Sequence, residues 1–296
     1  MENDTASPAP EANSFGAVYV LEPNAQHTHT AVLLHGRGSS GEEFAQELLE
    51  SPLSGQVTLA QKLAGWRLVF PSSRELWSTV FEEEMPAWFE AHSLTDVTAR
   101  QDLQMGGIRE SVKYLTTVLD EEIDRLGGRA ENLILGGISQ GGAIGMWTLL
   151  CSAYRGRHLG GFVGASTWLP FAENVMHYLG RATNAKEDPT AEVATSDADA
   201  FVESMMAPLK RSLADPGGSA LVHATPVFLG HGTDDAYVDI ELGRQARHVL
   251  TSVGLKVEWR EYAGAEQEGH WFKVPDEVDD MADFFTMVAS SSASTG

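Results

Sequence analysis

The sequence predicts an α/β fold with a mostly parallel central sheet and helices on both of its faces. Short apolar runs typical of buried strands alternate with longer segments of helical periodicity, which favours a parallel sheet between two helical layers. Polar loops carrying Ser, Asp and His follow several of the apolar runs, where the ends of parallel strands gather. The chain has 296 residues, which suffices for one large domain and does not require a second.

Seven segments are predicted to be strands. Residues 15–21 alternate between apolar and polar positions, as an edge strand does, and residues 256–262 alternate as well. The apolar run at 66–70 stops at Pro71. The predicted strands are residues 15–21, 30–34, 66–70, 132–135, 160–166, 226–230 and 256–262.

Seven further segments are predicted to be helices. The longest, residues 98–126, has apolar residues at helical spacing and ends at Gly127-Gly128, as a helix commonly does. The pair Gly106-Gly107 predicts a break in this helix or a turn before it. The predicted helices are residues 42–50, 57–64, 98–126, 143–151, 199–213, 240–250 and 276–288.

The domain organisation follows from changes in composition. Residues 1–13 lack the basic start and apolar core of a secretion signal, and we expect them to form a disordered N-terminal tail. Residues 14–289 are expected to form a single domain with an acidic insertion at about 181–218. We interpret this insertion as a surface loop with an attached helix rather than a lid. Residues 290–296 are expected to be a disordered tail.

The charge and the single cysteine restrict the classes of function. Lys and Arg number 20 and Asp and Glu 42, so the net charge of −22 argues against nucleic acid or an anionic membrane as a partner. No run is long enough to cross a bilayer, so stable membrane insertion is not expected. Cys151 cannot form an intramolecular disulfide and is expected to be a small buried residue, which fits a cytoplasmic location. No cluster of His and Cys has metal-ligand spacing, and we expect no metal and no cofactor.

A serine between glycines is the strongest chemical motif. Gly137-Ile138-Ser139-Gln140-Gly141 has the pattern Gly-x-Ser-x-Gly, and it lies between a predicted strand and a predicted helix, as a nucleophile elbow requires. The turn is so sharp that a Cβ at Gly137 or Gly141 would collide with the neighbouring strand or helix. The sequence therefore predicts that Ser139 is a nucleophile exposed at the end of a strand, beside a helix N-terminus that favours developing negative charge.

The glycine-rich loop at 35–41, directly after a predicted strand, is expected to contribute to an oxyanion hole. In serine hydrolases such a loop donates one backbone N–H and the residue after the nucleophile donates the other, which assigns Arg37 and Gln140 by their backbones. A phosphate-binding loop is the alternative, but the spacing and the Lys-Ser/Thr pair of a Walker motif are absent.

An elbow serine needs a histidine and a carboxylate that follow it in the chain, with the acid before the histidine. Asp235 and His270 meet this order, and each lies on a loop that follows a predicted strand. Asp234 and Asp239 lie on the same loop as Asp235, and spacing alone does not exclude Asp234. His231 is a second histidine after a strand, but we expect it to pack or hydrogen-bond beneath the site.

Two aromatic-rich connections are expected to line an apolar substrate groove. They cover residues 77–89 and 168–171, and both contain more aromatic residues than a solvated loop needs, although core packing explains any one of them equally well. The predicted substrate-binding residues are Trp77, Met85, Trp88, Phe89, Trp168 and Leu169.

Five motifs in order identify a resemblance to a known family. They are His35-Gly36-Arg37-Gly38, Met85-Pro86-Ala87-Trp88-Phe89, Leu135-Gly136-Gly137-Ile138-Ser139-Gln140-Gly141-Gly142-Ala143, Ser166-Thr167-Trp168-Leu169-Pro170 and His231-Gly232-Thr233-Asp234-Asp235. With these motifs the chain resembles the acyl-protein thioesterases of the phospholipase/carboxylesterase family, which have the α/β-hydrolase fold. The resemblance covers about residues 30–285, except for the insertion.

The resemblance assigns the acid and the histidine. The family pattern His-Gly-x-x-Asp-x-x-Val falls on Asp235, and its Gly-His pair falls on Gly269-His270. Arg37 departs from the family because an apolar residue usually follows the first His-Gly, and Asp239 stands where proline is common. An anionic or polar acyl group would suit an Arg37 side chain at the pocket rim; the alternative is that this side chain points to solvent and only its N–H matters.

The resemblance and the motifs together predict a serine hydrolase that cleaves carboxylic esters or thioesters through an acyl-enzyme intermediate. S-acylated proteins or lipids are the substrates that the resemblance implies. The alternatives are a small-molecule carboxylesterase or lysophospholipase with no protein substrate, and a non-catalytic ligand-binding protein of the same fold. The oligomeric state is expected to be a monomer or a homodimer.

Overall fold

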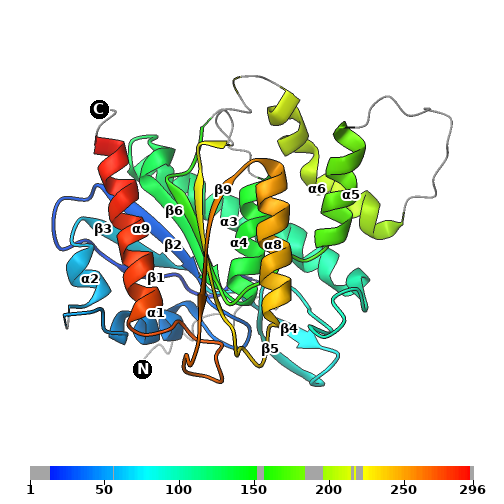
Figure 1. Cartoon of the computed structure of the whole chain (residues 1–296), viewed down its shortest axis with the longest axis horizontal. Coiled ribbons are helices and arrows are strands. Elements are labelled where there is room, and N and C mark those ends of the chain that lie inside the picture. Colours follow the sequence, from blue (N-terminus) through cyan, green and yellow to red (C-terminus); the bar gives the residue numbers. More distant parts are fainter. Residues whose placement is uncertain are drawn as a thin grey trace, which may run out of the picture.

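We describe a computed structural model of the chain, covering residues 14–55, 57–151, 157–183, 196–214, 217 and 223–293. A seven-stranded sheet forms its centre, in the order β1-β3-β2-β6-β7-β8-β9 (Figure 1). Only β1 is antiparallel, and it lies at one edge beside β3. The strands are β1 (Tyr19–Leu21), β2 (His29–Leu34), β3 (Trp66–Phe70), β6 (Leu133–Ile138), β7 (Gly161–Ala165), β8 (Pro226–Gly232) and β9 (Lys256–Tyr262).

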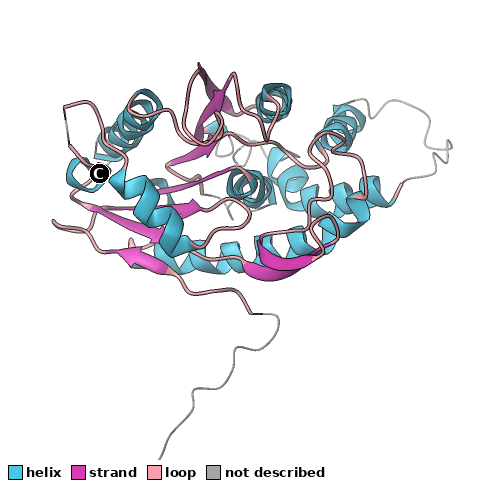
Figure 2. Ribbon diagram, turned by 90° about the horizontal axis from the view of Figure 1, so that it is seen from below, coloured by secondary structure: helices cyan, strands magenta, loops and turns pink. Residues whose placement is uncertain are grey.

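Helices cover both faces of the sheet (Figure 2). On one face α1 (Gly41–Glu50), α2 (Leu59–Lys62) and α9 (Asp276–Ala293) bury a core with alternate residues of the strands, such as Leu33 of β2. On the other face the strand residues of opposite parity, such as Val32, pack with a second group of helices. These are α3 (Gln101–Arg125), α4 (Gln140–Cys151), α5 (Ala172–Thr183), α6 (Asp197–Ala214) and α8 (Ile240–Val253). Because both faces are buried, the central strands are apolar throughout, which is why they were recognisable in the sequence.

The carboxyl ends of the parallel strands lie at one end of the sheet, and the loops after β2, β6, β8 and β9 meet there. A separate hairpin of β4 (Arg74–Ser78) and β5 (Glu83–Ala87) lies at the same end of the molecule (Figure 1). The connection predicted at 77–89 is therefore corrected to part of a hairpin, because residues 77–78 and 83–87 lie in its two strands.

The long helix α3 is continuous through Gly106-Gly107, where the sequence predicted a break or a preceding turn. The reason is packing. A Cβ on Gly107 would lie 2.7 Å from the Cα of Phe89, whereas one on Gly106 would meet no atom within 4 Å. Gly107 thus allows close packing between α3 and the segment after β5.

Part of the predicted insertion at 181–218 is buried. The helix α6 packs Phe201 against Trp147 of α4, with ring centroids 5.6 Å apart, so this part of 181–218 belongs to the core. Residues 184–195 lie outside the described residues, as does the predicted N-terminal tail at 1–13. At the C-terminal end, α9 continues to Ala293, beyond the predicted domain end at residue 289. Within the described ranges, no helix has both the length and the apolar character that a bilayer span requires.

Candidate active site

Ser139 occupies a sharp turn between β6 and α4. Its φ of 54° lies in the left-handed region, which is unusual for a residue with a side chain and typical of a strained functional turn. A Cβ on Gly137 would lie 2.7 Å from the carbonyl oxygen of Leu34, and one on Gly141 would overlap the same carbonyl group. The two glycines therefore have the steric role that the sequence predicted, and the elbow geometry is present.

His270 follows a second strained turn, which comes after β9. Gln267, Glu268 and Gly269 have φ values of 50°, 56° and 83°. The carbonyl of Glu268 accepts a hydrogen bond of 3.0 Å from the N–H of Ala236, which fastens this turn to the loop after β8. Two loops that are far apart in sequence are thereby held together.

Asp235 is the carboxylate that contacts His270. Its Oδ2 lies 2.8 Å from His270 Nδ1, and its Oδ1 accepts hydrogen bonds of 2.9 Å from the N–H groups of Tyr237 and Val238. Burial alone would raise the pKa of Asp235, but the hydrogen bond and charge of His270 and the two N–H donors outweigh it and lower that pKa. An ionised Asp235 fixes the imidazole with a proton on Nδ1, which leaves Nε2 as the proton acceptor.

The alternatives to Asp235 have other partners. Asp234 accepts a hydrogen bond of 2.9 Å from the N–H of Gly264, at the start of the loop that leads to His270. Asp239 caps α8 by accepting a hydrogen bond of 2.8 Å from the N–H of Glu241. Of the three aspartates, Asp235 is the one that holds the histidine.

His231 lies beneath the site, as expected. It is fully buried, its Nε2 lies 2.9 Å from the carbonyl oxygen of Val238, and the same nitrogen is 3.5 Å from Asp235 Oδ2. Burial is the main reason that the pKa of His231 is lowered, so the ring is neutral and donates from Nε2 to Val238. His231 thereby supports the loop that carries Asp235.

The two backbone groups predicted for an oxyanion hole lie beside Ser139. A Cβ on Gly36 would contact the Ser139 Cβ at 3.4 Å, so the chain entering Arg37 passes next to the serine. Gln140 is the first residue of α4, where an N–H has no acceptor within the helix. The side chain of Gln140 accepts from the N–H of Trp88 and donates to the carbonyl of Phe89, both at 2.8 Å. Only the backbone of Gln140 is therefore left for a substrate.

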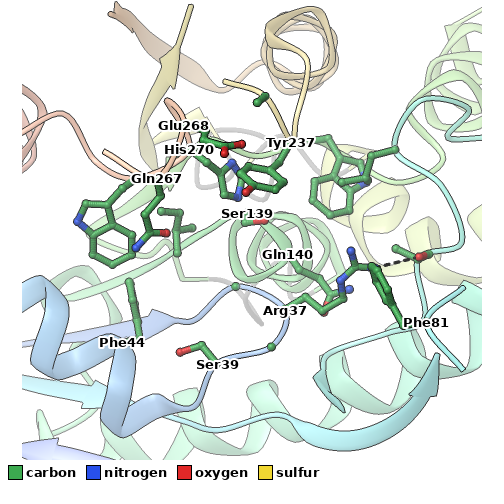
Figure 3. Close-up of a pocket in the computed structure, with 18 of the residues that line it drawn as sticks. Arg37, Ser39, Phe44, Phe81, Ser139, Gln140, Tyr237, Gln267, Glu268 and His270 are labelled. Atoms are coloured by element: carbon green, nitrogen blue, oxygen red, sulfur yellow. Dashed lines mark hydrogen bonds between the residues drawn. The ribbon is translucent and has the colours of Figure 1, made fainter. Parts of the chain in front are cut away.

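A cavity of about 930 Å³ opens over Ser139, and His270 also lines it (Figure 3). The described residues contain no hydrogen bond between the Ser139 hydroxyl and His270; in enzymes without substrate such catalytic contacts are often long. The aromatic and apolar lining residues are Phe44, Val80, Phe81, Ala91, Leu94, Ile138, Trp168, Ala236, Tyr237 and Trp271. The charged lining residues are Arg37, Glu43, Glu47 and Glu268.

The predicted substrate-binding residues are mostly placed elsewhere. Trp168 lines the cavity, but Trp88 and Phe89 are fully buried in the core, and Trp88 donates from Nε1 to the carbonyl of His35 at 2.9 Å. Leu169 is also buried.

The other two predicted residues lie on the hairpin. Trp77 is exposed and Met85 half-buried, and neither is among the cavity-lining residues. Phe81, which lies in the 77–89 connection expected to line the groove, does line the cavity, whereas sequence reasoning missed Phe44, Tyr237 and Trp271. For Tyr237 and Trp271 a signal was available, because each lies within two residues of Asp235 or His270 in the chain.

The Arg37 side chain does not extend into solvent. It is half-buried, its Nη1 donates to the carbonyl oxygen of Ala91 at 3.2 Å, and its guanidinium lies 5.0 Å from the centre of the Phe81 ring (Figure 3). The arginine thus joins the loop after β2 to the tip of the β4–β5 hairpin.

Comparison with known proteins agrees with this geometry. A family model described as phospholipase/carboxylesterase matches residues 16–208 and 198–288, which is most of the chain. The chain belongs to the phospholipase/carboxylesterase family. As a member of this family it is a hydrolase of carboxylic esters.

Curated relatives of this chain include acyl-protein thioesterases. Acyl-protein thioesterase 1 of Yarrowia lipolytica is 28% identical over 247 residues, covering 82% of this chain and 86% of that protein. Acyl-protein thioesterase 1 of Gibberella zeae is 27% identical over 273 residues, covering 90% and 94%.

Solved structures of other proteins share the fold of this chain. The crystal structure of Zea mays acyl-protein thioesterase 2 has a TM-score of 0.65 at 22% identity, covering 92% of this chain and 99% of that one. Arabidopsis thaliana SOBER1 has a TM-score of 0.61 at 24% identity, covering 88% and 99%. At these identities the structures establish the α/β-hydrolase fold.

Proposed function

We propose that this protein hydrolyses carboxylic esters or thioesters in two steps, with Ser139 as the nucleophile. In the first step the Ser139 oxygen attacks the carbonyl carbon while His270 Nε2 accepts the hydroxyl proton. His270 then gives this proton to the departing alcohol or thiol as the bond to the carbonyl carbon breaks. The product is an acyl-enzyme on Ser139.

The second step repeats the chemistry with water. His270 Nε2 accepts a proton from the attacking water and returns it to the Ser139 oxygen as the acid departs. Asp235 keeps the imidazole oriented and stabilises its positive charge in both steps. The N–H groups of Arg37 and Gln140 stabilise the tetrahedral oxyanion, by about 3 kcal/mol for each donor.

One observation carries this proposal. His270 Nδ1 lies 2.8 Å from a buried carboxylate oxygen of Asp235, and the histidine shares a cavity with an elbow serine at φ 54°. A carboxylate on Nδ1 gives the imidazole the tautomer that a general base needs, and the cavity gives it access to the serine.

The test is the hydrolysis of p-nitrophenyl butyrate by Ser139→Ala. We expect kcat to fall by about 10⁴-fold or more, because the nucleophile is removed. The matched control is Ser252→Ala, which removes an exposed hydroxyl on α8, outside the cavity, and should keep wild-type turnover. Full turnover by Ser139→Ala would contradict the proposal.

We propose further that the acyl donor includes thioesters and that S-acylated proteins or lipids are among the substrates. The names of the relatives, acyl-protein thioesterase 1, support this proposal. A series of p-nitrophenyl esters and matched thioesters from acetyl to palmitoyl tests it. Activity confined to acetyl and butyryl groups would instead support the small-molecule carboxylesterase, which the four charged residues in the cavity lining also favour.

A cytoplasmic location and a monomeric or homodimeric state complete the proposal. The single cysteine fits a reducing compartment. Fractionation of cells would test the location, and light scattering of the purified protein would test the oligomeric state.

A further inference from the structure

Arg37 places a positive charge in the active-site cavity without an acidic partner. No ion pair involves Arg37 within the part of the chain that the structure describes, and its one hydrogen bond goes to the neutral carbonyl of Ala91. Burial lowers the pKa of Arg37, and no carboxylate opposes that shift. A guanidinium has five N–H donors, so most of the hydrogen-bonding capacity of Arg37 is unused.

Two other largely buried arginines of the described residues are compensated by carboxylates. Arg67 is paired with Glu122 at 3.0 Å and also with Glu22, and Arg74 is paired with Glu110. A half-buried cation that lines the substrate cavity and lacks such a partner is expected to be compensated by a ligand.

The position of Arg37 assigns that ligand to one part of the substrate. His270 must reach the leaving group to protonate it, so the leaving group lies on the side of His270. In Figure 3 Arg37 lies on the other side of Ser139, toward Phe81. The acyl group is therefore the part of the substrate that faces the guanidinium.

In the part of the chain that the structure describes, none of the cavity carboxylates forms an ion pair or hydrogen bond with Arg37. Glu43 and Glu47 belong to α1, where Glu43 forms a capping box with Ser40, and Glu268 precedes His270. Arg37 instead contacts the carbonyl oxygen of Ala91 and the ring of Phe81. Arg37 is the one Arg or Lys among the described residues that line the cavity, so it is the side chain there that attracts an anion.

We infer that the Arg37 guanidinium binds an anionic group on the acyl part of the substrate, so that half-esters and half-thioesters of dicarboxylic acids are preferred substrates. This inference rests on the proposed function, because it assumes that Ser139 is acylated. The planar guanidinium matches a carboxylate with two parallel hydrogen bonds, and the Phe81 ring holds it in position.

The experiment compares matched substrates. Each anionic substrate is a mono-p-nitrophenyl ester of a linear dicarboxylic acid, from glutarate to suberate. Its neutral partner carries an isopropyl group in place of the carboxylate, so that two methyl groups replace the two oxygens. After subtraction of spontaneous hydrolysis, we expect wild-type kcat/KM to favour the anionic member by about 10- to 100-fold for at least one chain length, as for a charged hydrogen-bonded pair. Added salt should reduce this preference.

The Arg37→Gln variant should lose most of the preference, whereas Arg37→Lys should keep part of it. Because the backbone N–H of residue 37 remains in both variants, the ratio between the two substrates reports on the side chain alone. The matched control is Arg109→Gln. Arg109 also lies over a phenylalanine, 4.9 Å from the centre of the Phe201 ring, but it does not line the cavity, so its loss should leave the ratio unchanged.

The inference is overturned if the wild type shows no preference for the anionic ester at any chain length, or if Arg37→Gln keeps the preference. Either result would leave the proposed function intact as long as Ser139→Ala abolishes hydrolysis of the neutral esters. Unchanged hydrolysis by Ser139→Ala would instead refute the proposed function.

Discussion

Asp234 and Asp235 are adjacent in the chain, yet their carboxylates hold two separate parts of the loop that carries His270. Asp235 contacts the His270 ring at 2.8 Å, and Asp234 accepts the N–H of Gly264 at 2.9 Å, where the loop begins. The first contact orients the imidazole, and the second fixes the path of the chain toward it. The two residues therefore differ in what their removal should do.

Asp235→Asn should lower kcat for p-nitrophenyl butyrate by about 10³- to 10⁴-fold, because an amide favours the wrong tautomer of His270 and does not stabilise the imidazolium. Asp234→Asn removes one charge from an adjacent residue but keeps a hydrogen-bond acceptor for Gly264. We expect it to retain kcat within about 10-fold. Equal losses in the two variants, measured side by side, would argue against the separate roles.

Gly107→Ala should destabilise the protein, because the added Cβ would lie 2.7 Å from the Cα of Phe89 and force α3 away from the segment after β5. We expect the free energy of unfolding to fall by about 1–3 kcal/mol. Gly106→Ala, one residue earlier in the same helix, meets no atom within 4 Å and should raise that free energy by up to about 1 kcal/mol. Urea denaturation of both variants gives the comparison, and a destabilised Gly106→Ala would contradict it.

These two glycines also show which features were predictable from the sequence. The elbow, the order of Ser139, Asp235 and His270, and the buried strands depend on local patterns, so they could be read from the sequence. The close approach of Gly107 to Phe89 joins residues that are 18 positions apart, and no local pattern announces it.

The substrate cavity was predicted less well for the same reason. Trp88 and Phe89 look like groove residues in the sequence, but the β4–β5 hairpin turns them into the core beneath the site. The cavity wall is built from seven separate stretches of the chain, including the one that runs into α1 and the hairpin tip, and their meeting depends on the tertiary fold. The sequence left the placement of the Arg37 side chain open between solvent and substrate, because its contacts Ala91 and Phe81 lie 54 and 44 positions further along the chain.

Glu277→Gln should change the pH dependence of stability. Burial raises the pKa of Glu277 to about 8 from its ordinary 4.5, and Oε1 has no hydrogen-bond partner. Between these two values the folded protein binds a proton that the unfolded chain has released. Raising the pH through this window therefore lowers the free energy of unfolding, by about 1.4 kcal/mol per pH unit for a single group.

Thermal denaturation at pH 5 and pH 8 tests this linkage. The stability of Glu277→Gln relative to wild type should rise between the two pH values, because the variant lacks the titrating group. Glu266→Gln makes the same charge change at an exposed position and serves as the control. The same difference between Glu277→Gln and wild type at both pH values would contradict the prediction.

Covalent labelling with a fluorophosphonate probes the central claim most directly, since it reports the activated nucleophile without assuming a substrate. The intact protein should gain the mass of one phosphonyl group, the peptide map should place it on Ser139, and esterase activity should be lost in proportion. His270→Ala should slow the labelling strongly. Failure of Ser139 to react, with esterase activity preserved in the treated enzyme, would contradict the account.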